Sequence, residues 1–360
     1  MDDDDLRVIR FVCTDRGQHP ETKLGNYSHL PVSVGVPPMI SGHKRLDPTL
    51  RGRKRRVANS EFVTSTLQLE CPRCGRTPQL STQTLAKLAG ATIDKLSGGR
   101  FLFGFGPSGP QVSEGWHGVK FDKPLARTRE YTEIVRKALR REKLSYDGEF
   151  FTLPLPDGPG KALTLTVHPV RDYIPMYLAA IGPKNLELTG ELFDGWLAIF
   201  FNPEFAPELL SHIEAGRQKA GKTLEGFDVV PTVPVVFGDD LEACAMPVRA
   251  YSALYIGGMG SRDKNFYNQL ATRMGYEEAA IDIQNKYLAK DQMGAMAAVP
   301  LDFIDKTSLI GPADRVKDRL HAYADAGVTT LTVATYAGSL DERLRTLRTM
   351  AEVVEAAGLA

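Results

Sequence analysis

From about residue 85 to the C-terminus, short apolar runs alternate with amphipathic stretches, as expected of βα units around a parallel sheet. Strands are predicted at the apolar runs 100–106, 174–180, 195–200, 227–236 and 329–334. Pro231 and Pro234 interrupt the fourth of these runs and weaken its pattern. Helices are predicted at 81–96, 124–140, 185–193, 207–220, 313–326 and 341–357, and a helical insertion at about 241–290. This order indicates an α/β fold that ends in the closing units of a barrel or of a doubly wound sheet.

The first eighty residues lack this alternation. They contain the basic cluster 51–56, brief apolar pieces at 8–12 and 30–36, and no helix of three turns with an apolar stripe. Three interpretations of this segment are considered: a disordered arm, a small accessory module, or out-of-frame sequence that does not belong to the fold. We therefore expect a division into an atypical segment, 1–80, and a main domain, 81–360.

The composition of the chain indicates which kinds of molecule it binds. The chain has 360 residues, of which 42% are hydrophobic and 24% charged, and its formal net charge is zero, so no global field favours nucleic acid or an anionic membrane. No apolar run reaches the length of about 18 residues that spans a bilayer, and the start, Met1 to Asp5, is acidic. We expect a cytoplasmic enzyme that acts on a small molecule.

The four cysteines do not indicate a disulfide framework or a metal centre. Cys71 and Cys74 have the spacing of half a zinc ribbon, but no second pair follows. Completion of the site by Cys13, His19, His29 and His43 would require irregular spacing. Reduced thiols and no metal are expected.

A glycine-rich segment, Gly104-Phe-Gly-Pro-Ser-Gly109, follows the first predicted strand and matches the dinucleotide-binding pattern. That pattern requires a helix to start at once, whereas Pro107 and Pro110 break the chain and no helix is predicted between this segment and Pro124. Glycines at a strand end still let a flat ring approach the backbone. The alternative is an ordinary wide loop.

The segment Ala179-Ala-Ile-Gly-Pro-Lys-Asn185 has the features of an anion site. Gly182 permits a tight turn, and Pro183 is suited to open a helix whose free N–H groups would face a phosphate. Lys184 and Asn185 would add charge and donors in the first turn. A capped helix start without a ligand is the alternative.

Two further segments are candidates for contact with substrate. Trp116 and His117 lie in a loop, where the indole could line a pocket and the imidazole could transfer a proton, although both could be packing or surface residues. In the insertion, Tyr255 and Lys264 lie among glycines and aromatics that could form a substrate lid or a plain turn between helices.

Longer motifs carry a resemblance to a known family. The segments 96–118, 123–131, 179–185, 194–196 and 308–312 closely resemble the luciferase-like monooxygenase family, in the branch of coenzyme F420-dependent oxidoreductases. The resemblance covers about residues 84–360. It implies a (β/α)₈ TIM barrel of the bacterial-luciferase-like type, with the deazaflavin at the carboxyl ends of the strands. The first three βα units of such a barrel are not recognisable in the sequence.

The resemblance also implies roles for individual residues. Those expected to border the cofactor ring are Gly104, Gly106, Pro107, Ser108 and Gly109; those expected to hold its phosphate end are Ala180, Ile181, Gly182 and Pro183. Trp196 is expected to line the pocket. Some relatives carry a catalytic glutamate where this chain has Pro107, so no catalytic residue is assigned, and His117 is a candidate only.

The resulting hypothesis is an F420-dependent oxidoreductase that transfers a hydride between the deazaflavin and a small organic substrate. An FMN-dependent monooxygenase of the same fold is the first alternative. An inactive barrel that lacks part of its cofactor pocket and a Rossmann dehydrogenase are the others. A homodimer is implied by the family resemblance alone.

Overall fold

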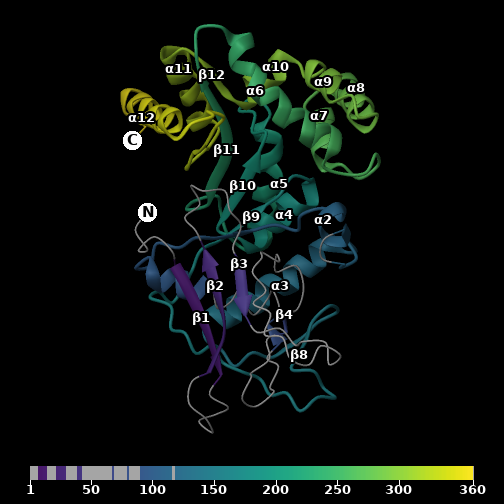
Figure 1. Ribbon diagram of the computed structural model, residues 1–360, viewed down its shortest axis with the longest axis vertical. Helices are drawn as coiled ribbons and strands as arrows, with labels where there is room; N and C mark the ends of the chain where they lie inside the picture. Colours follow the sequence, from purple (N-terminus) through teal and green to yellow (C-terminus); the bar gives the residue numbers. More distant parts are fainter. Residues whose placement is uncertain are drawn as a thin grey trace, which may run out of the picture. The chain divides into compact units, whose positions relative to one another are not determined.

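The computed structural model describes residues 90–115 and 118–359, together with five strands within the first 89 residues. The chain divides into two compact units, Met1–Ile93 and Asp94–Ala360 (Figure 1). Trp116, His117, Cys71 and Cys74 lie outside the described residues.

The first unit contains only antiparallel strand pairs among its described strands. β1 (Arg7–Cys13), β2 (Thr22–His29) and β3 (Met39–Gly42) form a three-stranded sheet in sequence order. β4 (Leu67–Gln68) and β5 (Gln79–Leu80) form a separate pair. None of these pairings is the parallel pairing of a βα unit.

The second unit is built on a parallel sheet of six strands. They are β6 (Phe103–Phe105), β9 (Met176–Ala179), β10 (Gly195–Ile199), β11 (Asp228–Phe237), β12 (Leu309–Gly311) and β13 (Thr332–Thr335). The order across the sheet is β12-β11-β10-β9-β6, and β13 also pairs with β11. Every predicted strand is therefore present, and β12, which was not predicted, adds a sixth.

Helices follow the strands as the periodicity predicts. α3 (Pro124–Leu139), α4 (Pro183–Leu192), α5 (Ala206–Lys219), α11 (Ala313–Asp325) and α12 (Leu340–Ala356) each lie within a few residues of the predicted bounds. No helix was predicted between Gly109 and Pro124. This prediction is wrong, because the short α2 (Pro110–Gly115) begins there, at a proline. Proline tolerates the first turn of a helix, so Pro110 starts a helix instead of breaking one.

The helical insertion is longer than predicted. It comprises α6 (Leu241–Ala253), the π-helix η4 (Leu254–Gly258), α7 (Phe266–Arg273), α8 (Glu277–Leu288), α9 (Gln292–Ala297) and α10 (Leu301–Thr307). α9 and α10 are six and seven residues long. Such short helices hardly repeat the apolar period, which is why the predicted insertion stops at about residue 290.

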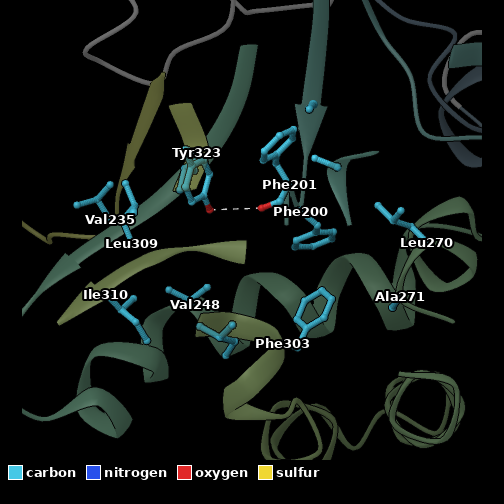
Figure 2. Close-up of a cluster of buried hydrophobic side chains, with 14 of the residues drawn as sticks. Phe200, Phe201, Val235, Val248, Leu270, Ala271, Phe303, Leu309, Ile310 and Tyr323 are labelled. Atoms are coloured by element: carbon cyan, nitrogen blue, oxygen red, sulfur yellow. Dashed lines mark hydrogen bonds between the residues drawn. The ribbon is translucent and has the colours of Figure 1, made fainter. Parts of the chain in front are cut away.

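The two faces of the sheet differ in burial. On β10, Trp196 and Ala198 are buried against the helices, whereas Leu197 and Ile199 on the opposite face are only half-buried. Figure 2 shows the core beyond the end of β10, where Phe200 and Phe201 contribute rings to the cluster. Tyr323 of α11 donates a hydrogen bond of 3.3 Å from its hydroxyl to the Phe201 carbonyl oxygen.

The two prolines in β11 are compatible with a ten-residue strand. Pro231 lies opposite Ala198 of β10, before the pairing with β13 begins at Thr232. Pro234 lies opposite Ala334 of β13, beyond the last residue paired with β10. Each proline therefore has a paired neighbour on one side only, so its missing N–H can face the unpaired side.

Candidate functional site

Two glycine-rich turns lie side by side at the carboxyl edge of the sheet. β6 and β9 are parallel neighbours, with Phe105 opposite Leu178, so the turns that follow them leave the same edge. A Cβ on Gly106 would lie 3.0 Å from the Cβ of Ala179, which is tighter than ordinary contact. Glycine at position 106 thus allows the two strand ends to approach closely.

The turn after β6 borders a cavity of about 310 Å³. Its walls include Gly106 and Pro107 from the turn, Arg127 and Tyr131 from α3, and the loop that carries Phe121. Burial raises the pKa of the Tyr131 phenol, which keeps the hydroxyl protonated.

The other glycine-segment residues lie near this cavity without lining it. Gly104 lies within β6 and faces Leu197, whose Cδ1 would be 2.9 Å from a Cβ at position 104. Ser108 has a positive φ of 60°, unusual for a residue with a side chain, and Gly109 precedes α2.

The turn after β9 opens α4 as the sequence predicts. Gly182 is the N-cap in an extended conformation, and Pro183 occupies the first turn. A Cβ on Gly182 would meet nothing within 4 Å, so the space beside this backbone is open. Ala180 is buried behind the turn, with 2% of its surface exposed.

Contrary to the prediction, Lys184 does not place its charge at this turn. Its Nζ donates a hydrogen bond of 2.8 Å to Glu187 Oε2 one turn further along α4, and the side chain is 80% exposed. The ion pair at i,i+3 draws the ammonium along the helix surface. The Asn185 side chain, in contrast, has a buried Oδ1 to which no hydrogen-bond donor of the described residues reaches.

Arg273 supplies the cation at the turn that Lys184 does not. It lies at the end of α7 and lines a second cavity of about 310 Å³ with Ile181, Gly182 and Pro183. Its Nη2 donates a hydrogen bond of 2.8 Å to the Ile181 carbonyl oxygen, and its Nη1 contacts Glu208 Oε1 at 3.2 Å. The insertion is thereby joined directly to the turn that precedes α4.

Trp196 lies behind the sheet and not along the cavities, which corrects its expected place in the pocket. It is 2% exposed, its Nε1 donates a hydrogen bond of 2.9 Å to the Ala180 carbonyl oxygen, and its ring packs 6.0 Å from that of Phe201. Alternation along β10 places residue 196 on the buried side of the strand together with Ala198, and β10 packs against α4.

The remaining predicted substrate residues are separated by the structure. Tyr255 lies in η4 and packs against Phe200, which follows β10 directly. Lys264 is exposed in the turn before α7. Both are placed in the insertion as expected, but only Tyr255 contacts the carboxyl edge of the sheet.

The sequence pattern gave no signal for Arg273 or for Gln269 and Thr272, which line the same cavity. Ile181 and Arg273 are 92 positions apart in the chain. Basic residues are common in the last turn of a helix, where they interact favourably with the helix dipole. The position of Arg273 in the sequence therefore does not indicate a binding site.

Comparison with known proteins identifies the family of the chain. The model of the family described as luciferase-like monooxygenase matches residues 78–330. The chain belongs to the luciferase-like monooxygenase family. A protein of Mycobacterium tuberculosis named as a coenzyme F420-dependent oxidoreductase is 39% identical over 268 residues, which is 72% of this chain and 77% of that protein. The 5,10-methylenetetrahydromethanopterin reductase of Archaeoglobus fulgidus is 30% identical over 260 residues, with 70% and 72% covered.

Solved structures with the same fold confirm the predicted fold class. The coenzyme F420-dependent tetrahydromethanopterin reductase of Methanopyrus kandleri superimposes with a TM-score of 0.61 at 24% identity, covering 76% of this chain and 77% of that one. An F420-dependent secondary alcohol dehydrogenase, solved with an F420-acetone adduct, gives a TM-score of 0.60 at 16% identity over 76% of each chain. The α/β architecture is that of the luciferase-like barrel. No helix among the described residues of this luciferase-like chain is long and apolar enough to cross a membrane.

Proposed function

We propose that this luciferase-like chain is a coenzyme F420-dependent oxidoreductase that transfers a hydride between the deazaflavin and a small organic substrate. The observation that carries the proposal is the pair of adjacent turns at the carboxyl edge of the sheet, at Gly106 and Gly182, each bordering a cavity. Ligands of parallel α/β sheets bind at this edge. The names of the relatives from Mycobacterium tuberculosis and Archaeoglobus fulgidus support the same assignment of class.

The second turn has the donor chemistry of a phosphate site. Pro183 and Lys184 begin α4, so the positive end of the helix dipole lies at this turn. Pro183 has no N–H, and the N–H groups of Asn185 and Leu186 donate to the Gly182 carbonyl oxygen at 3.0 and 2.9 Å, so the Lys184 N–H is the first-turn donor that could meet a phosphate. Arg273 adds a fixed cation, and Thr272 and Gln269 add polar groups on the opposite wall. We assign the phosphate end of the cofactor to Ala180, Ile181, Gly182 and Pro183, with Arg273 as a further member.

The first turn suits a flat ring. Gly104, Gly106 and Gly109 carry no Cβ, and Pro107 gives a rigid apolar surface beside the cavity. We assign the ring system to these four residues and Ser108. When bound there, the deazaflavin supplies the hydride chemistry, and the protein orients the substrate and limits access of water.

A paired titration tests the proposal. Purified chain is titrated with F420 and with FMN, and cofactor fluorescence is followed. We expect F420 to bind at least tenfold more tightly than FMN. Tighter binding of FMN would instead indicate the flavin monooxygenase, and no binding of either would indicate an inactive barrel.

A variant at Gly182 shows whether binding occurs at the assigned turn. The extended conformation of Gly182 is one that valine adopts readily, and the space at its Cβ is open, so Gly182→Val should fold normally while its side chain occupies the cofactor's place. Gly338→Val, at a second glycine with nothing within 4 Å of the Cβ position, is the matched control. Equal F420 affinity of the two variants would contradict the assignment of the phosphate end.

A further inference from the structure

Four tyrosines form one cluster at the carboxyl edge of the sheet, which we call the tyrosine cluster. Tyr251 of α6, Tyr255 of η4 and Tyr267 of α7 pack around Phe200, and Tyr336 packs against Tyr251. Phe200 directly follows β10, and Tyr336 directly follows β13. The cluster therefore occupies the next stretch of the edge that carries the two glycine-rich turns, because β10 pairs with β9.

The rings of the cluster are in direct contact. The ring centroids of Tyr251 and Tyr255 are 4.6 Å apart, and those of Tyr255 and Tyr267 are 4.7 Å apart at an interplanar angle of 88°. Phe200 meets Tyr251 at 5.5 Å and Tyr255 at 6.0 Å, both edge to face. All four tyrosines remain half-buried and not fully enclosed, so the cluster is a partly open aromatic surface. Figure 2 shows Phe200 above Phe303, which closes the cluster on its core side.

The backbone around the cluster is held in uncommon conformations. Phe200 has a positive φ of 50°, and Tyr255 lies in a π-helix; both features concentrate at functional sites. Asn265, which is 1% exposed, donates from Nδ2 to the carbonyl oxygens of Tyr255 and Ile256 at 3.0 and 2.9 Å. These bonds satisfy carbonyls in the π-helical turn and fix the position of the Tyr255 ring.

The hydroxyls of the cluster lack the carboxylate partner that four other tyrosines of the described part of the chain have. Four tyrosines elsewhere each donate a hydrogen bond to a carboxylate: Tyr146 to Glu133, Tyr173 to Asp194, Tyr177 to Asp228 and Tyr276 to Asp302. No described hydrogen bond or ion pair brings a charged side chain to a hydroxyl of the cluster. Burial raises the pKa of Tyr251 and Tyr267, and that of Tyr336 to about 12. Burial therefore favours the protonated phenol at Tyr251, Tyr267 and Tyr336, and a protonated phenol can donate a hydrogen bond.

Resting on the proposed function, we infer that the tyrosine cluster is the substrate-binding wall and selects a flat, uncharged substrate with a carbonyl or hydroxyl oxygen. Aromatic faces and edges favour a planar molecule by stacking. The phenol protons favour an oxygen acceptor on that molecule. A phosphorylated or carboxylated substrate would have to give up its hydration at a surface without a charged partner, which disfavours it. The cluster residues are specificity-determining residues, and none is assigned a proton transfer.

Ligand binding to the full chain tests this inference without cofactor. Saturation-transfer NMR is carried out with three probes of similar size: acetophenone, which is flat and has a carbonyl oxygen; 1-cyclohexylethanone, which has the oxygen but is not flat; and ethylbenzene, which is flat without the oxygen. Glucose 6-phosphate is the charged probe. We expect acetophenone to bind at least fivefold more tightly than each of the other three.

Variants locate the binding to the cluster. In Tyr255→Phe/Tyr267→Phe the rings remain and two donors are lost, so acetophenone affinity should fall about fivefold while ethylbenzene binding is unchanged. Tyr287→Phe is the matched control, since the Tyr287 ring packs under Gly257 and Gly258 of η4 without belonging to the cluster. Circular dichroism melts check that each variant is folded, and the comparison of the four probes on the unsubstituted chain stands if a variant does not fold.

Two results would overturn the inference: glucose 6-phosphate binding as tightly as acetophenone, or equal acetophenone affinity in the double variant and in the unsubstituted chain. Titration of the same samples with F420 distinguishes a failure of this inference from a failure of the proposed function. Loss of F420 binding with the probe selectivity intact would count against the cofactor assignment alone. F420 binding without probe selectivity would count against the substrate class alone.

Discussion

The guanidinium of Arg273 donates a hydrogen bond of 2.8 Å from Nη2 to the carbonyl oxygen of Ile181. This bond connects α7, in the insertion, with the turn that we assign to the cofactor phosphate. Because Glu208 Oε1 lies 3.2 Å from Nη1, the guanidinium is held from two sides. The Arg273 side chain therefore links the insertion directly to this turn.

Arg273→Gln should weaken F420 binding about tenfold, because a charge-assisted contact and the support of the Ile181 carbonyl are both lost. Fluorescence titration measures the change, and 5-deazariboflavin, which lacks the phosphate, serves as the second ligand. Its affinity should change by less than twofold. Arg262→Gln is the matched control, since Arg262 is an exposed arginine of the same insertion that bonds Asn285 Oδ1 at 2.6 Å. An equal effect of both substitutions would remove Arg273 from the site.

Trp196→Phe should lower the free energy of unfolding by about 2 kcal/mol, because the Ala180 carbonyl loses its donor and part of a buried ring is removed. Urea unfolding followed by circular dichroism measures the loss. At 15 °C, where the variant is expected to be folded, its F420 affinity should stay within twofold of the unsubstituted value. A tenfold weaker affinity in a folded variant would instead return Trp196 to the pocket wall.

The ion pair between Arg129 of α3 and Glu191 of α4 should make stability depend on pH. Its two hydrogen bonds measure 2.6 and 2.7 Å, and the Arg129 bond is the main reason that the Glu191 pKa lies below its ordinary 4.5. A lowered carboxyl pKa stabilises the folded state above the ordinary value, and this contribution is lost as pH falls through the folded-state pKa. Both side chains are partly exposed, at 38% and 26%, which limits the contribution to about 1 kcal/mol.

Glu191→Gln should accordingly cost about 1 kcal/mol at pH 7 and almost nothing at pH 3. Urea titrations at the two pH values give the difference. Asp314→Asn is the control, because Asp314 is 98% exposed and its contact with Lys317 is 3.9 Å long. A penalty for Glu191→Gln that is the same at both pH values would show that the ion pair is not its source.

Gly190 and Gly216 should not tolerate a methyl group. A Cβ on Gly190 would lie 1.9 Å from the Ile213 carbonyl oxygen, and one on Gly216 would lie 1.9 Å from that of Glu187. The backbones of α4 and α5 are thus in contact through glycine, and either alanine substitution must push the helices apart. We expect Gly190→Ala to cost about 3 kcal/mol, against less than about 0.5 kcal/mol for Gly338→Ala at an open position. Similar unfolding midpoints for the two variants would contradict this packing.

Two side-chain contacts in the structure could not be predicted from the local sequence pattern. The buried carboxylate of Glu130 accepts hydrogen bonds from the N–H groups of Glu149 and Phe150, at 2.7 and 3.0 Å, and so holds the loop between β7 (Tyr146–Asp147) and β8 (Thr152–Leu153). Nothing in the local pattern around residue 130 distinguishes this glutamate from a surface one. The Lys184 side chain was expected at the turn because residue 184 directly follows Pro183. Its Nζ instead donates a hydrogen bond to the carboxylate of Glu187 on the same helix.

Local pattern was sufficient to predict five of the six strands of the parallel sheet, the long helices that follow them, the glycine-rich turn at residues 104–109, and a helix opened by Pro183. These follow from apolar periodicity and from the backbone preferences of glycine and proline, which act within a few residues. Three relationships became visible only in the folded chain: Trp196 faces the helices, Arg273 bonds Ile181, and four tyrosines from separate elements form one cluster beside Phe200. Those relationships depend on which elements pack together, and the energy of such contacts is set between residues far apart in the chain, where local pattern carries no information.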